Sequence, residues 1–266
     1  MRTGRRPRHQ QPSTEPRLGL LRDVADELRW TATSRKGWLI GLATNFFVAV
    51  IYVGYTHFDP RRPGDIRIAN VGTAVAVWVL SNTLNTNQLG ADSDRVVASL
   101  ERGDSVPRIL AIKNLALAVF LVPLAIVISI AVRILVDRWR LLPHAVMMDV
   151  GAVFLWLGVG SVISVLLPYR PIALRARWRR RRTWPRWAFC LALPDLTYFL
   201  VLPFLHVPYF AIYSEKVFGP YQRNFLIYSA VYLGIGVVYW VIGLLLASLY
   251  ARRRPTQLTD NLARNS

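Results

Sequence analysis

The sequence predicts an all-α integral membrane protein, a bundle of six transmembrane helices preceded by an amphipathic helix at the membrane surface. Two observations predict this class. Hydrophobic residues make up 53% of the 266 residues, yet 33 Lys and Arg residues stand against 15 Asp and Glu residues. An apolar composition and a net charge of +18 are compatible when apolar residues face lipid and basic residues lie in connecting loops. A nucleic-acid-binding domain would carry this charge on a folded polar surface, whereas here it lies between apolar runs, so no nucleic-acid partner is expected.

The apolar residues form long runs that match the thickness of a bilayer. About 20 residues at 1.5 Å per residue cross ~30 Å of hydrocarbon. Runs of this length without strand-like alternation indicate helices, because backbone groups in lipid must bond within their own segment. The predicted transmembrane domain, residues 38–250, contains six such runs, at 38–55, 68–88, 109–132, 146–167, 187–207 and 225–250.

The distribution of Lys and Arg predicts the orientation. Of the 33, 24 lie in the N-terminal segment, the C-terminal segment and the loops 91–108 and 169–186. Eight lie in the loops on the other side of the predicted membrane, and the remaining one is Lys113. Because basic loops are retained in the cytoplasm, both termini are predicted to be cytoplasmic.

Three segments flank or precede the spans. Residues 1–17 are basic, Pro-rich and nearly free of large apolar residues, which predicts disorder. Residues 251–266 are predicted to be a cytoplasmic tail. Residues 18–37 contain an expected amphipathic helix that lies along the membrane interface or stands in solvent before the first span. Its apolar positions recur at helical spacing, with acidic and basic residues elsewhere on the wheel: Leu18, Leu21, Val24, Ala25 and Leu28 against Arg22, Asp23, Asp26 and Glu27.

The loop after the second span is expected to contain a short helix. Asp92 or Ser93 is a suitable N-cap, and Gly103 is suited to end the helix in a left-handed conformation. Val96, Val97 and Leu100 share one face, while Asp94, Arg95, Glu101 and Arg102 project towards the cytoplasm. Such a helix either docks a soluble partner or simply packs at the interface within a loop.

A resemblance to a known family bears on this choice. Asn87–Gln88–Leu89–Gly90–Ala91–Asp92, followed by Val106–Pro107–Arg108–Ile109–Leu110–Ala111–Ile112–Lys113–Asn114–Leu115–Ala116, resembles the segment between the second and third spans of ABC-2-type exporter permeases. The resemblance covers about 30 residues, and the rest of the chain is similar in topology only. It implies that Asp92 to Gly103 form a helix that docks on a separate ATPase subunit. On this basis the docking residues are Asp92, Asp94, Arg95, Val96, Val97, Leu100, Glu101 and Arg102.

Other sites are not predicted. The chain lacks the G-x-x-x-x-G-K-[ST] phosphate loop, so the ATPase of such an exporter would be a separate polypeptide. Cys190 is the single cysteine and the four histidines show no ligand spacing, so no metal site or cofactor is expected. No arrangement of side chains indicates catalysis.

Polar residues within the runs are the candidates for a transport path, because charges in lipid are costly and normally face the bundle interior. They are Lys113, Asn114, Asp195, His206, Asn82 and Asn85. Lys113 and Asp195 are expected to form a structural ion pair across the bundle, to take part in transport, or to remain apart, with the lysine reaching towards the membrane surface and the aspartate protonated. Arg133 and Asp149 are expected to form a pair at the outer interface or to remain solvated.

These observations predict the permease subunit of a bacterial ABC-2-type exporter in the plasma membrane, working as a homodimer or with a related permease. Two alternatives remain open. A proton-coupled secondary transporter would use Asp195 and His206 as proton sites. A membrane scaffold would keep the fold without transport.

Overall fold

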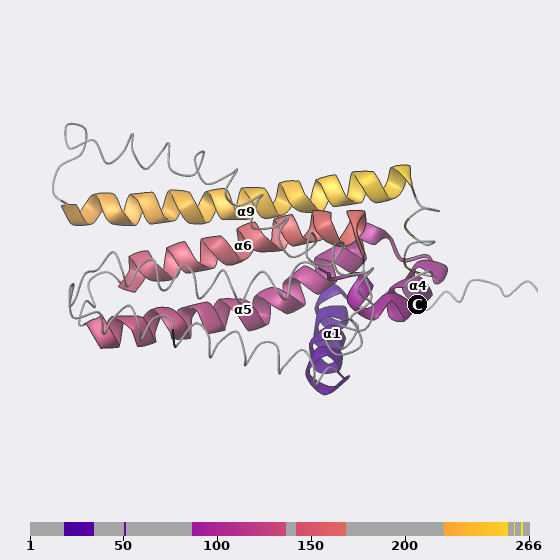
Figure 1. The fold of residues 1–266 in the computed structure, drawn as a ribbon, viewed down its shortest axis with the longest axis horizontal. Coiled ribbons are helices and arrows are strands. Elements are labelled where there is room, and N and C mark those ends of the chain that lie inside the picture. Colours follow the sequence, from indigo (N-terminus) through magenta and orange to yellow (C-terminus); the bar gives the residue numbers. More distant parts are fainter. Residues whose placement is uncertain are drawn as a thin grey trace, which may run out of the picture.

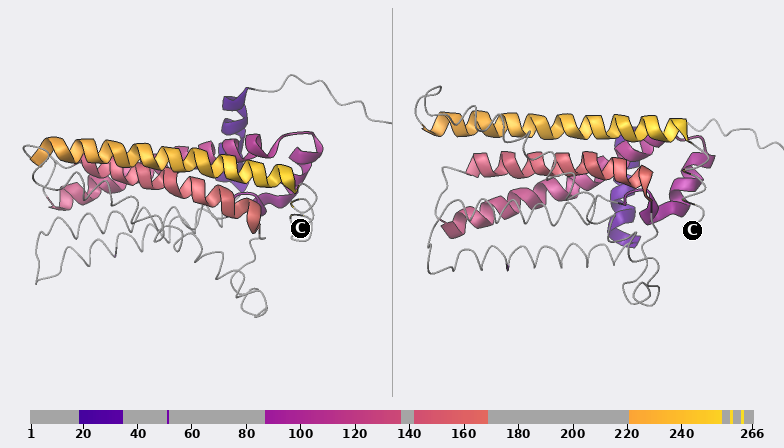
Figure 2. Two further views of the ribbon diagram at one scale, coloured as in Figure 1. Left: turned by 90° about the horizontal axis from the view of Figure 1, so that it is seen from above. Right: turned by 45° about the horizontal axis from the view of Figure 1, so that its top comes forward.

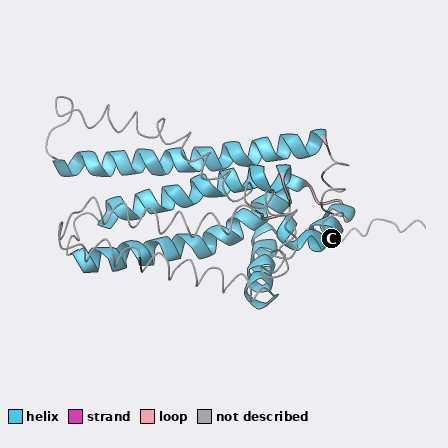
Figure 3. Ribbon diagram, viewed as in Figure 1, coloured by secondary structure: helices cyan, strands magenta, loops and turns pink. Residues whose placement is uncertain are grey.

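The computed structural model describes residues 19–34, 51, 87–136, 142–168, 221–254, 258 and 262. Within these residues every regular element is helical (Figure 3). The elements are α1 (Leu20–Ser34), a 3-10 turn η1 (Gly90–Asp92), α4 (Ser93–Glu101), α5 (Val106–Val136), α6 (Leu142–Leu166) and α9 (Tyr221–Arg253). The predicted all-α class agrees with this part of the chain.

Three helices lie side by side along the length of the molecule (Figure 1). They contain the segments that are long and apolar enough to cross a bilayer, Val106–Ala131 in α5, Leu142–Leu166 in α6 and Ser229–Arg253 in α9. These segments correspond to the predicted runs 109–132, 146–167 and 225–250. The run 187–207, and nearly all of the runs 38–55 and 68–88, lie outside the described residues.

Helices α6 and α9 run in the same direction with a constant register. His144 meets Ser229, Gly151 meets Gly236 and Gly158 meets Gly243, so each pair is one heptad from the next. The spacing is that of a seven-residue helix seam, in which the same face of each helix turns to its neighbour at every second turn.

Glycine lets the two backbones touch. A Cβ on Gly158 would lie 2.5 Å from the carbonyl oxygen of Tyr239, and one on Gly236 would overlap the backbone of Gly151. Small residues at such positions allow the close approach by which helices associate in membranes, where lipid removes the hydrophobic driving force.

The side of this pair that faces α5 contains the central core. Leu121 and Ala125 of α5 pack with Val153 and Leu157 of α6, and Tyr232 of α9 completes the cluster. By contrast, Val238, Ile242, Leu245 and Leu249 leave an apolar face of α9 exposed. An apolar exterior around a packed interior is the pattern expected of a helix bundle in lipid.

Helix α1 crosses the end of α5 at a steep angle to the bundle, as two views agree (Figures 1 and 2). The buried face of α1 is made of Val24, Glu27 and Thr31, while the side chain of Leu21 is 84% exposed on another side. Helix α4 lies at this same end (Figure 1). The end of the bundle at which α1 and α4 lie is called the inner end below.

Candidate functional site

The inner end holds a buried group of charges centred on Lys113, in the third turn of α5. Its ammonium group donates to Asp92 Oδ2 at 2.6 Å and to Glu27 Oε1 at 2.9 Å. The Lys113 side chain is 9% exposed and the two carboxylates are similarly buried. A buried ammonium between two carboxylates is stable only when hydrogen bonds compensate for lost hydration, and both acids supply them here.

Arg95 of α4 is the second cation of this group. Its guanidinium lies 3.0 Å from Glu27 Oε2 and 3.8 Å from Asp92 Oδ2, so the same two acids serve both cations. It also lies 4.2 Å from the ring centroid of Trp30, which is the distance of a cation–π contact. Two positive and two negative side chains, which we call the inner charge network, therefore join α1, α4 and α5.

A second ion pair reinforces the contact between α1 and α5. Arg108 Nη2 donates to Asp23 Oδ2 at 2.6 Å, one helical turn before Glu27 along α1. Arg108 is in the first turn of α5, so α1 is fixed to this helix at two successive levels. Helix α1 is thus held by charges, and not only by its apolar residues.

Next to Lys113, the fully buried Asn114 links the loop before α4 to α6. Its amide exchanges hydrogen bonds with the side-chain amide of Gln88, at 3.2 and 3.3 Å, and donates to Ser161 Oγ at 2.9 Å. Ser164 accepts from the backbone N–H of Gln88 at 2.7 Å. Neutral hydrogen bonds therefore fix the start of the α4 loop against the inner end of α6.

Helix α4 turns an apolar side inward and a charged side outward. Val96 is buried, with Val97 and Leu100 packed against the same cluster, while Asp94, Glu101 and Arg102 are exposed. After the helix, Gly103 has φ = 87°, the left-handed conformation that ends helices and that glycine adopts without strain. The predicted shared face of Val96, Val97 and Leu100 and the predicted end at Gly103 are confirmed.

Three expectations require correction. Asp92 is at the N-cap position but makes no side-chain capping bond, because its carboxylate binds Lys113 instead. Glu27, which the helical wheel placed on the polar side of its helix, is buried because it neutralises Lys113. The alternative that Arg133 and Asp149 remain solvated is wrong, because both are buried.

Several predicted site residues lie outside the described residues, namely Asp195, His206, Asn82 and Asn85. The expected pairing of Lys113 with Asp195 therefore stays a prediction. What the structure adds is that Lys113 already has two carboxylate partners in α1 and η1.

The opposite end of the bundle has its own polar contacts. Ser129 of α5 donates to Asp149 Oδ2 of α6 at 2.5 Å, and Arg133 is buried one turn further along α5. His144 of α6 and Ser229 of α9 are hydrogen-bonded. At this end, polar groups therefore link α5 to α6 and α6 to α9.

The hydrogen-bonding and ion-pair partners that sequence reasoning missed are Glu27, Ser161 and Ser164. A lysine inside an apolar run signals that acidic partners exist, yet nothing in the local pattern identifies which acids they are. No protein-family model, no curated protein and no solved structure matches the chain. The role of the site therefore has to be inferred from the geometry of its residues.

Proposed function

We propose that the chain is the membrane-spanning permease subunit of an ABC-2-type exporter in a bacterial plasma membrane, energised by a separate ATPase subunit. The observation that carries the proposal is the joint between α4 and the bundle. Asp92, at the start of α4, forms a buried ion pair with Lys113 of α5, and the partly exposed Arg95 of α4 pairs with the buried Glu27 of α1. A force applied to the exposed side of α4 passes through this inner charge network to a long apolar helix.

The exposed side of α4 is suited to a soluble partner. Asp94, Glu101 and Arg102 present both signs of charge on a short helix that ends at the tight turn of Gly103. Alternating charges at a surface favour one docking orientation over others more than they add raw affinity. A helix that served only to close a loop would not require a rigid charged joint behind it.

The proposed topology draws support from the directions of the described helices. Helices α6 and α9 are parallel, so the chain between them has to return from the inner end to the opposite end. The predicted span 187–207 would make this return. Helix α1 and the loop before α4 both lie at the inner end, which accords with an even number of crossings between them. Six spans with both termini cytoplasmic satisfy both conditions. One six-span chain would form a complete pathway with a second copy or a related permease.

The decisive experiment is site-specific cross-linking in native membranes. A photoreactive amino acid replaces Glu101 or Arg102 of α4 in turn, and Leu245, exposed on the apolar face of α9, is the control position. Membranes are also treated with radioactive azido-ATP, so that any nucleotide-binding polypeptide is labelled. We expect a labelled adduct from each α4 position and none from position 245.

Three other outcomes would overturn the proposal. Absence of a labelled adduct from both α4 positions would remove the ATPase partner. Export that stops with an uncoupler while ATP is maintained, together with loss of export in Asp195→Asn, would favour the proton-coupled transporter. A labelled adduct that forms without ATP-dependent export would favour the scaffold.

A further inference from the structure

The C-terminal segment after α9 contributes two buried leucines to the base of α4. Leu258 is 3% exposed and Leu262 is fully buried. They are the large apolar residues of the otherwise polar segment 255–266. The backbone N–H of Leu258 donates to the carbonyl of Arg254 at 3.2 Å, and Leu258 and Leu262 are themselves helical. At a spacing of four residues, two leucines in helical conformation share one face.

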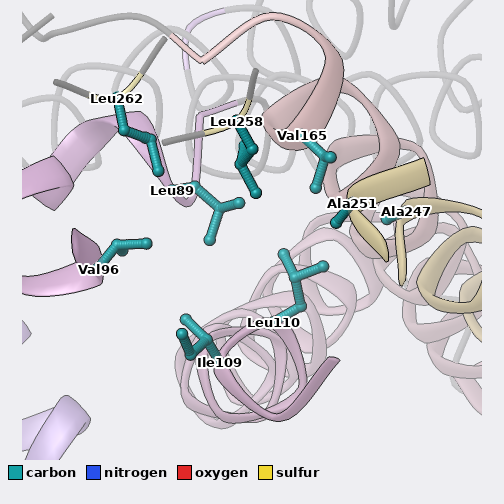
Figure 4. Packing of buried hydrophobic residues seen from close by; sticks show 9 residues of the cluster. All are labelled: Leu89, Val96, Ile109, Leu110, Val165, Ala247, Ala251, Leu258 and Leu262. Atoms are coloured by element: carbon teal, nitrogen blue, oxygen red, sulfur yellow. The ribbon is translucent and has the colours of Figure 1, made fainter. Parts of the chain in front are cut away.

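The cluster that receives these leucines joins separate parts of the inner end. It contains Leu89 before α4, Val96 of α4, Ile109 and Leu110 of α5, Val165 of α6, and Ala247 and Ala251 of α9. Figure 4 shows the side chains of Leu258 and Leu262 directed towards Leu89. Leu89 is fully buried, and Val96 is the most deeply buried apolar residue of α4.

This arrangement gives α4 two different attachments. Its first turn is held by the inner charge network through Asp92 and Arg95. Its apolar side is held by a cluster that Leu258 and Leu262 help to enclose. Because α4 is only nine residues long, its position depends on such tertiary contacts rather than on its own helix stability.

We propose that the C-terminal segment is a positioning element for α4, in which Leu258 and Leu262 hold the apolar side of the docking helix against the inner ends of the spans. The inference rests on the proposed function, because it assigns the segment a role in the attachment of the ATPase subunit.

The test compares two pairs of substitutions with the same chemistry. Leu258→Ala with Leu262→Ala removes the two buried leucines. The control is Leu245→Ala with Leu249→Ala, a pair at the same spacing on the exposed face of α9. A third variant, Leu258→Met with Leu262→Met, keeps the side-chain volume and is expected to behave like the wild type.

The first readout is hydrogen exchange of the purified full chain, which needs no ATPase. In the buried-pair alanine variant we expect exchange of the α4 amides to rise by about tenfold or more, because local contacts set local opening. The α6 amides around Val153, which packs in the central core and not in this cluster, should be unchanged. The second readout is the yield of the azido-ATP-labelled adduct from a cross-linker at position 102. It is expected to fall severalfold in this variant and to be restored in the methionine variant.

The results distinguish the positioning role of the C-terminal segment from the proposed function of the chain. Unchanged α4 exchange in the buried-pair alanine variant would overturn the positioning role while leaving the proposed function intact. Faster α4 exchange with an undiminished adduct would show that the leucines pack against α4 without positioning it for the partner, and would also overturn the role. If the wild type itself yields no labelled adduct, the proposed function fails, whatever the exchange shows.

Discussion

The ammonium group of Lys113 lies 2.9 Å from the carboxylate of Glu27, although the two residues are 86 positions apart in the sequence. The contact joins α1 to α5 and is shared with Asp92 and Arg95 at the start of α4. The packing of α1, α4 and α5 against one another therefore depends on two cations and two carboxylates that neutralise each other. Removal of any single member leaves an excess of charge where water has little access.

Lys113→Met should therefore be strongly destabilising. The change leaves Glu27 and Asp92 with Arg95 alone, and an unbalanced buried charge costs about 3–5 kcal/mol. Lys113→Met combined with Glu27→Leu removes one charge of each sign and leaves Asp92 beside Arg95, so it should be more stable than the single variant. The free energy of unfolding, from titration with SDS in mixed micelles, measures both. A double variant less stable than Lys113→Met would show that the pair is not coupled.

The seam between α6 and α9 makes a prediction with an internal control. Gly236→Ala places a methyl group against the backbone of Gly151, so the helices must separate, at a cost of about 1–3 kcal/mol. Gly234→Ala, two residues away in α9, meets no atom within 4 Å. It should be neutral or stabilising by up to about 1 kcal/mol, because alanine favours the helix. The same unfolding measurement applies, and equal effects of the two substitutions would contradict the close packing.

Membrane topology can be tested with reporter fusions. Reporters active only in the cytoplasm should be active after Arg102, Arg182 or Ser266, and reporters active only outside should be active at Gly64, Arg138 or Gly219. The reason is the concentration of Lys and Arg in the segments predicted to be inside. An external reporter that is active in the 175–186 loop would reverse the orientation of the whole bundle.

The sequence was sufficient to predict elements whose signal is local. The run 109–132 predicted a span that the structure places within Val106–Val136, because unbroken apolar character over this length is typical of a helix that crosses a bilayer. Gly103 was likewise predictable as a helix end, since its conformation depends on its own lack of a side chain. Both features are decided within a few turns of chain.

Long-range partners could not be predicted in the same way. Lys113 indicated that some acid must be near, but the choice of Glu27 and Asp92 depends on how α1 crosses α5. Leu258 lies in residues 251–266, which the sequence predicts only as a cytoplasmic tail, and nothing in the local pattern indicates that it is buried. Its burial follows from the location of α9's end beside α4, which no local pattern encodes.

The last prediction concerns the exposed side of α4. Glu101→Lys combined with Arg102→Glu reverses two exposed charges without touching the inner charge network. If this side contacts the ATPase subunit, each reversed charge meets a like charge, and affinity should fall by about tenfold or more. The measurement is the amount of azido-ATP-labelled polypeptide that co-purifies with the tagged chain as the salt concentration is varied.

The matched control reverses an equally exposed pair on α1, Arg22→Glu with Asp26→Lys, at the same end of the bundle. It should retain the partner, because specific docking depends on where charges lie rather than on how many there are. Both variants conserve net charge, so a general effect on solubility or insertion would appear equally in each. Equal retention of the labelled polypeptide by the α4 variant and the α1 control would mean that Glu101 and Arg102 do not contact it, and α4 would then be only a packed interfacial helix.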